Sequence, residues 1–148
     1  MAIEYGFIIE GVRKPKELAD VWVQAGKGTP LSAEGEICIS RMPGNVHATA
    51  FVQDEPLRLH AIEEFGLDAE VSVVFRLDIY NLADGLDSVI DACRSMLDAT
   101  PGDCILLYNW EKIVFRRTSA GLIVNSKFGQ FAKVAVQLSS HARIAELD

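Results

Sequence analysis

The sequence contains few residues of the kinds that perform catalysis or bind metals, and none of them has a recognised spacing. No pair matches the C-x-x-C or H-E-x-x-H spacing that holds zinc in short motifs. We interpret the cysteines as buried free thiols of a reducing compartment and the histidines as solvated surface side chains. The residues concerned are Cys38, Cys93, Cys104, His47, His60 and His141, of which His47 and His60 would share a site if they lay on one sheet face.

Nucleophile and phosphate motifs are also missing. Neither the G-x-S-x-G elbow nor the G-x-x-x-x-G-K-[ST] loop occurs, and Gly26-Lys27-Gly28 follows a predicted helix instead of opening one. The pair Arg116-Arg117 could bind an anion, but a single pair of arginines is more typical of an exposed strand end. We therefore expect no enzymatic activity, no metal and no cofactor.

One patterned set of polar residues does stand out, in the segment from Asn81 to Ala99. Four aspartates recur there at intervals of three, four and seven residues, which places them along one side of a helix. An exposed helix face is normally charged, so a solvated surface explains most of this pattern. Aspartate is nevertheless a poor helix former, and a rigid acidic stripe is what docking to a basic partner requires. The four are Asp84, Asp87, Asp91 and Asp98.

The charge of the whole chain agrees with such a partner. The formal net charge is −7 over 148 residues, which makes nucleic acid and anionic membranes poor candidates, because affinity for phosphate needs clustered Lys and Arg. No apolar run approaches the roughly 20 residues of a membrane helix, and the first residues lack the pattern of a signal peptide. We expect a cytoplasmic protein of a single domain, residues 1–148.

Hydropathy periods predict the elements that must position these residues. Alternation predicts a strand from Ile3 to Ile9, two strands joined by a type II turn at Pro43-Gly44, and a less regular strand from Pro56 to Glu64. Helical spacing predicts one helix after Lys14-Pro15 and a second, continuous one over 81–99 with Asn81 as its N-cap. The two strands joined by that turn are Glu36–Met42 and Val46–Gln53, and the other predicted strands are Val71–Ile79, Cys104–Tyr108, Lys112–Arg117 and Leu122–Asn125.

The order of these elements predicts the fold class. Neighbouring strands joined by short turns favour a mostly antiparallel sheet with two helices packed on one face, an α+β domain. For the last 20 residues or so the periodicity favours neither helix nor strand.

Several strings resemble one group of small bacterial proteins. They are the opening M-A-I-E-Y, V-V-F-R-L-D, the long acidic helix, and T-P-G-D-C-I-L-L-Y-N-W-E-K-I-V-F-R-R. Together they resemble the immunity proteins paired with swarmer-inhibition (Sit) polymorphic toxins and related toxin-immunity families, over the first strand and about residues 70–124. The resemblance implies a cytoplasmic protein without a catalytic motif that binds a cognate toxin domain and blocks it.

Three hypotheses follow. The first is an immunity protein whose partner-binding residues are the four aspartates, with Trp110 at a hairpin tip as an aromatic anchor; a basic toxin surface would complement them. The second is a small-molecule binding or sensing domain without catalytic activity, its pocket lined by Phe51, His60, Arg76 and Tyr108. The third, a homo-oligomeric subunit, rests only on the unpaired sheet edges of such a fold. The sequence specifies neither an oligomeric state nor the identity of a toxin.

Overall fold

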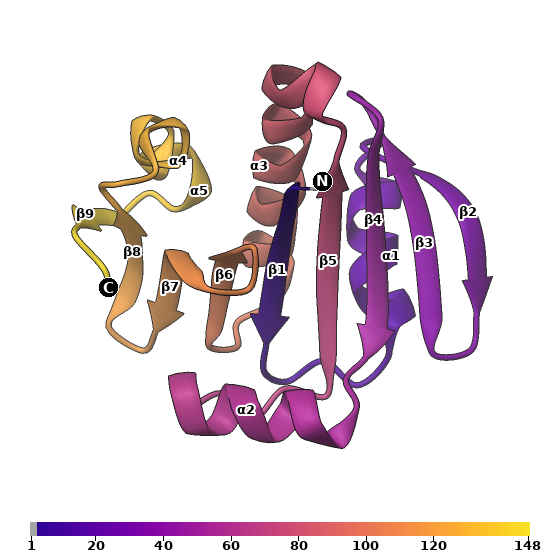
Figure 1. Cartoon of the computed structure of the whole chain (residues 1–148), viewed down its shortest axis with the longest axis horizontal. Coiled ribbons are helices and arrows are strands. Elements are labelled where there is room, and N and C mark those ends of the chain that lie inside the picture. The colour runs from indigo at the N-terminus through magenta and orange to yellow at the C-terminus, as the bar shows by residue number, and fades with distance from the viewer. Residues whose placement is uncertain (1–2) are drawn as a thin grey trace.

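The computed structural model describes residues 3–148, without the side chains of Ala33 and Glu34. Met1 and Ala2, the first two letters of M-A-I-E-Y, lie outside the described residues. The described chain forms one nine-stranded sheet of order β2-β3-β4-β5-β1-β6-β7-β8-β9 (Figure 1). The strands are β1 Ile3–Ile9, β2 Thr29–Glu34, β3 Ile37–Met42, β4 Val46–Val52, β5 Val71–Leu77, β6 Cys104–Tyr108, β7 Lys112–Thr118, β8 Gly121–Asn125 and β9 Arg143–Ala145.

The sheet is antiparallel at every pairing except the last, in which β9 runs parallel to β8. This confirms the expected mostly antiparallel sheet. The first strand of the chain lies at the centre of the sheet, between β5 and β6. Its consecutive residues Phe7, Ile8 and Ile9 are all buried, which requires cover on both faces because side chains alternate along a strand.

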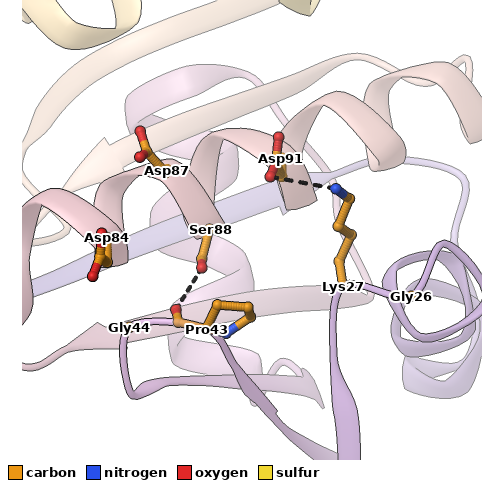
Figure 2. A pocket seen from close by; sticks show the side chains of 8 residues that line it. All are labelled: Gly26, Lys27, Pro43, Gly44, Asp84, Asp87, Ser88 and Asp91. Atoms are coloured by element: carbon orange, nitrogen blue, oxygen red, sulfur yellow. Dashed lines mark hydrogen bonds and ion pairs between the residues drawn. The ribbon is translucent and has the colours of Figure 1, made fainter.

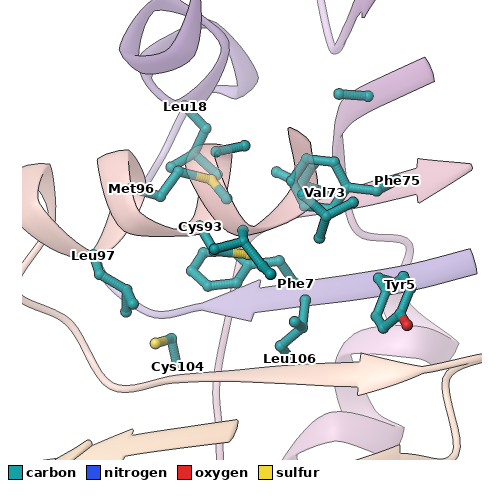
Figure 3. Close-up of a cluster of buried hydrophobic side chains, with 14 of the residues drawn as sticks. Tyr5, Phe7, Leu18, Val73, Phe75, Cys93, Met96, Leu97, Cys104 and Leu106 are labelled. Carbon is teal, nitrogen blue, oxygen red and sulfur yellow. The ribbon is translucent and has the colours of Figure 1, made fainter. Parts of the chain in front are cut away.

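The main core lies between the sheet and two helices, α1 (Pro15–Gln24) and α3 (Leu82–Ala99), which Figure 1 shows behind the strands. Phe7 and Phe75 of the sheet meet Leu18, Cys93 and Met96 of the helices, and all five are fully buried (Figure 3). Pro15 occupies the first turn of α1, where its missing N–H costs no hydrogen bond. The observed bounds of both helices confirm the predicted ones within a few residues.

The strand predicted from Pro56 to Glu64 is wrong. These residues form helix α2 (Glu55–Phe65), because Asp54 caps its N-terminus by accepting a hydrogen bond of 3.0 Å from the backbone N–H of Leu57. Gly66 ends the helix in the left-handed conformation, with φ +68°. The apparent alternation is misleading because Leu57 and Leu59 are both about half exposed.

Helix α2 also corrects the expectation that the helices pack on one face. It crosses the ends of the strands on the side away from α3 (Figure 1) and contributes to a second, smaller apolar cluster. Ile8, which points away from Phe7, belongs to that cluster with Ala61 of α2 and Ile105 and Leu107 of β6. Beyond α2, the strands β3, β4, β5 and β1 leave a shallow hollow lined by Glu4, Ile39, His47, Thr49, Val74 and Arg76.

The remaining differences lie at the edges of the sheet and at the end of β5. Strand β2 was not predicted, and the final segment forms two short helices, α4 (Gly129–Lys133) and α5 (Ala135–Leu138), before the edge strand β9. Strand β5 ends at Leu77 rather than Ile79, because Ile79–Asn81 turn as a short 3₁₀ helix, η1. None of the described helices has the length and apolar character needed to cross a membrane.

Candidate partner-binding site

The acidic face of α3 borders a groove of about 350 Å³. Asp84, Asp87 and Asp91 form one wall, as the helical spacing predicted, and Figure 2 shows the three side chains along α3. The opposite wall comes from the turn between β3 and β4 and from the loop after α1. Those two segments supply Pro43, Gly44, Gly26 and Lys27.

The β3–β4 turn is held firmly against α3. The hydroxyl of Ser88 donates a hydrogen bond of 2.5 Å to the carbonyl oxygen of Pro43 (Figure 2). Gly44 lies so close to the helix that a Cβ there would stand 2.7 Å from the carbonyl carbon of Asp84. Gly44 has φ +79°, as the predicted type II turn requires, and Asn45 follows with φ +58°. The groove is therefore a preformed feature with a rigid wall.

Only one of the three groove carboxylates is paired. The Nζ of Lys27 lies 3.6 Å from Asp91, with both side chains nearly half exposed, so the pair contributes little to stability. Among the described side chains, neither Asp84 nor Asp87 lies within ion-pair distance of a cation. The groove consequently carries uncompensated negative charge on a fixed surface, the arrangement that attracts a basic partner.

Asp98 lies apart from the other three. It borders a smaller hollow of about 170 Å³ at the C-terminal end of α3, together with Arg117, Leu138 and Ser139. The structure thus places three of the four predicted aspartates on one groove and leaves the fourth on the same helix beyond it.

Trp110 lies elsewhere again. It follows Asn109 in the β6–β7 turn, both with positive φ, and its ring folds back over β1, where a Cβ on Gly6 would overlap the indole. The ring is partly buried in the cluster of Ile8 and Ile105, on the face of the sheet opposite to α3. The structure therefore does not bring Trp110 together with the aspartates.

The pair Arg116-Arg117 is neither an anion site nor an exposed strand end. Both side chains are partly buried and donate to backbone carbonyls: Arg116 to Phe65 at the end of α2, and Arg117 to Leu97, Thr100 and Gly102 at the end of α3. Arg117 thereby satisfies carbonyls that a helix C-terminus leaves without partners. Sequence reasoning missed this role, since the carbonyls come from other segments.

The other candidates for chemistry remain separate. Cys38, Cys93 and Cys104 are free and buried, and burial raises the pKa of Cys104 to about 12 and that of Cys93 well above its ordinary value, so these two thiols stay protonated. His47 lines the hollow on the open sheet face, whereas His60 lies on α2 against Phe65. Within the described residues no three His, Cys, Asp or Glu side chains could hold a metal ion together.

The four residues of the small-molecule hypothesis are spread over the structure, with Phe51 on β4. Arg76 borders the open sheet face and is bound to Glu4, with 2.8 Å between Nη2 and Oε2. Tyr108 borders a different hollow near Phe128 and Asn125, and His60 projects from α2. Neither of these two hollows is lined by more than one residue of the set.

Comparison with known proteins adds a family to this geometry. A family model described as SitI3-like matches residues 3–134, which includes the middle of the chain that the resemblance in the sequence did not reach. No curated protein and no solved structure matches the chain. Since the family model covers most of the residues, including every element that forms the groove, the chain belongs to the SitI3-like family.

Proposed function

We propose that this protein is an immunity protein that neutralises a cognate toxin domain by binding to it and covering its active surface. The observation that carries the proposal is the family match over residues 3–134, since the family implies a protein toxin as partner. Neutralisation by coverage needs no catalytic group on the inhibitor. The proposal therefore accounts for a fold in which the thiols are buried and the histidines are dispersed.

The acidic face of α3 is our candidate for the contact. Asp84, Asp87 and Asp91 lie on a groove whose far wall is fixed by the Ser88–Pro43 hydrogen bond. A preformed surface loses little conformational entropy on binding, which favours tight association. Uncompensated carboxylates also steer a basic partner toward this face and speed the encounter. Asp98 extends the acidic face toward the end of the helix, at the border of the contact.

Trp110 belongs to this proposal only as a second, separate contact. Its ring is partly buried on the other side of the sheet, so a toxin that reached both Trp110 and the groove would have to wrap around the molecule. We place the protein in the cytoplasm, where a producing cell requires protection and where free thiols such as the three found here stay reduced.

The test is direct neutralisation. The proposal expects a neighbouring gene to encode a toxin with a C-terminal toxin domain. That domain is expressed under an inducible promoter, with and without this chain, and cell survival is measured. The proposal predicts survival only with the chain present, and a one-to-one complex of the two purified proteins. If the chain neither protects cells nor binds that domain, the proposed function is wrong.

A further inference from the structure

Three large apolar side chains are exposed at the start of α3. Tyr80 is 89% exposed, Ile79 48% and Leu82 36%. Single exposed apolar residues are ordinary on a protein surface, but three within four positions form a patch. Among the described large hydrophobic residues Tyr80 is the most exposed, so its aromatic ring contributes little to the fold. We call Ile79, Tyr80 and Leu82 the apolar patch.

The patch is displayed on a rigid turn. One carboxylate oxygen of Asp78 accepts a hydrogen bond of 2.9 Å from the backbone N–H of Tyr80. The other accepts from the side-chain amides of Asn81, at 3.0 Å, and Asn45, at 3.2 Å. Asn81 therefore does not cap α3 with its side chain, contrary to the expectation from the sequence. Its amide helps to fix the turn that carries Tyr80.

The patch adjoins the acidic groove through the β3–β4 turn. Asn45 of that turn binds Asp78 just before the patch, and Gly44 packs on the backbone of Asp84 just after it. Two consecutive residues of one turn thus contact both sides of the patch. The same turn thus borders the groove and holds the residues on either side of the patch in the sequence.

The charge of the segment that contains the patch indicates the kind of partner surface. Between Arg76 and Arg94 the chain contains four aspartates, at positions 78, 84, 87 and 91, and no Lys, Arg or His. The negative charge of this segment favours a partner surface that is basic around an apolar centre. Aromatic residues surrounded by polar ones are typical of the central, energetically dominant contacts of protein interfaces.

We propose that Tyr80 is the aromatic anchor of the toxin interface, inserted with Ile79 and Leu82 into an apolar socket on a basic face of the toxin domain. This inference rests on the proposed function and names the residue that contributes most to the affinity for the toxin domain. Tyr80 lies in η1, directly before the helix that carries the acidic face, and its burial on binding removes apolar surface from water without a change in the fold.

The experiment compares the dissociation constants of variants of this protein for the same purified toxin domain. Tyr80→Ala removes the ring, Tyr80→Phe keeps it, and Leu59→Ala removes a half-exposed apolar side chain from α2. We expect Tyr80→Ala to weaken binding by a factor of about 10 or more. Tyr80→Phe should stay within a factor of about 3 of the wild type, and Leu59→Ala should bind like the wild type.

The possible outcomes separate this inference from the proposed function. If the wild type fails to bind the toxin domain, the proposed function is wrong, and so is the role of Tyr80 as its anchor. If the wild type binds and Tyr80→Ala binds equally well, only the anchor is wrong. Because Tyr80 is almost fully exposed, thermal unfolding of Tyr80→Ala should match the wild type, so weaker binding cannot be attributed to a damaged fold.

Discussion

The hydroxyl of Ser88, on a buried side of α3, lies 2.5 Å from the carbonyl oxygen of Pro43 and joins the helix to the β3–β4 turn across 45 residues of sequence. Removal of the hydroxyl leaves that carbonyl without its partner and releases one wall of the groove. We expect Ser88→Ala to lower the free energy of unfolding by about 1–2 kcal/mol, measured by urea denaturation. Ser95→Ala, at a partly exposed position of the same helix, is the control and should change it by less than about 0.5 kcal/mol. Equal effects of the two substitutions would contradict this role for Ser88.

Gly44 is predicted to tolerate no side chain, for two separable reasons. Its φ of +79° strains any L-residue, and a Cβ would stand 2.7 Å from the backbone of Asp84. Gly11 has φ +85° with nothing within 4 Å of the corresponding position, so Gly11→Ala measures the strain alone, about 1–2 kcal/mol. Gly44→Ala should cost about 1–3 kcal/mol more than that and should weaken toxin binding. A Gly44→Ala variant as stable as Gly11→Ala would show that the turn can move away from the helix freely.

Trp110 is predicted to act mainly on stability. Its ring covers Gly6 and packs in the cluster of Ile8, Ile105 and Leu107. Trp110→Ala should lower the free energy of unfolding by about 2 kcal/mol, less than for a fully buried tryptophan because the ring is partly exposed. Thermal unfolding and toxin affinity are measured on the same samples. Lost affinity at unchanged stability would instead place the indole in direct contact with the toxin.

Asp78 gives the turn under Tyr80 a defined pH dependence. The backbone N–H of Tyr80, followed by the amides of Asn45 and Asn81, holds the pKa of the Asp78 carboxyl below its ordinary value. A lowered folded-state pKa means that these bonds stabilise the fold above the unfolded-state pKa of about 3.9. The stabilisation is lost as the pH falls through the lower folded-state value. The stability difference between wild type and Asp78→Asn should therefore be constant near neutral pH and shrink below about pH 4. A difference that stays the same down to pH 2 would contradict the network.

Local patterns in the sequence were sufficient for the strong elements but not for α2 and the edges. The stripe of apolar residues in α3 and the alternation in β1 and β5 predict those elements because their faces are uniformly buried. Helix α2 buries only Ala61 fully, so its hydropathy has no helical period. Its sequence signals are the cap residues Asp54 and Gly66 and the early Pro56, which are typical of helix ends.

In the candidate site too, features within one element can be predicted from the sequence, whereas contacts between distant segments cannot. The alignment of Asp84, Asp87 and Asp91 follows from helical spacing within one element, and the structure places all three on one groove. The opposite wall, with Pro43 and Lys27, comes from segments more than 40 residues away, and no periodicity encodes that contact. The position of Trp110 depends likewise on a close approach to Gly6 from another strand.

The association rate with the toxin domain tests the central claim most directly. One variant reverses the charge of the groove through Asp84→Lys, Asp87→Lys and Asp91→Lys. A control variant makes the same change in net charge on exposed residues of α2 through Glu55→Lys, Glu63→Lys and Glu64→Lys. With rates measured between about 50 and 300 mM salt, we predict that the groove variant associates at least about 10-fold more slowly at low salt and loses most of its salt dependence. The α2 variant should stay close to the wild type. Equal slowing in both variants would show that only net charge matters, and an unchanged rate in the groove variant would remove the acidic face of α3 from the interface.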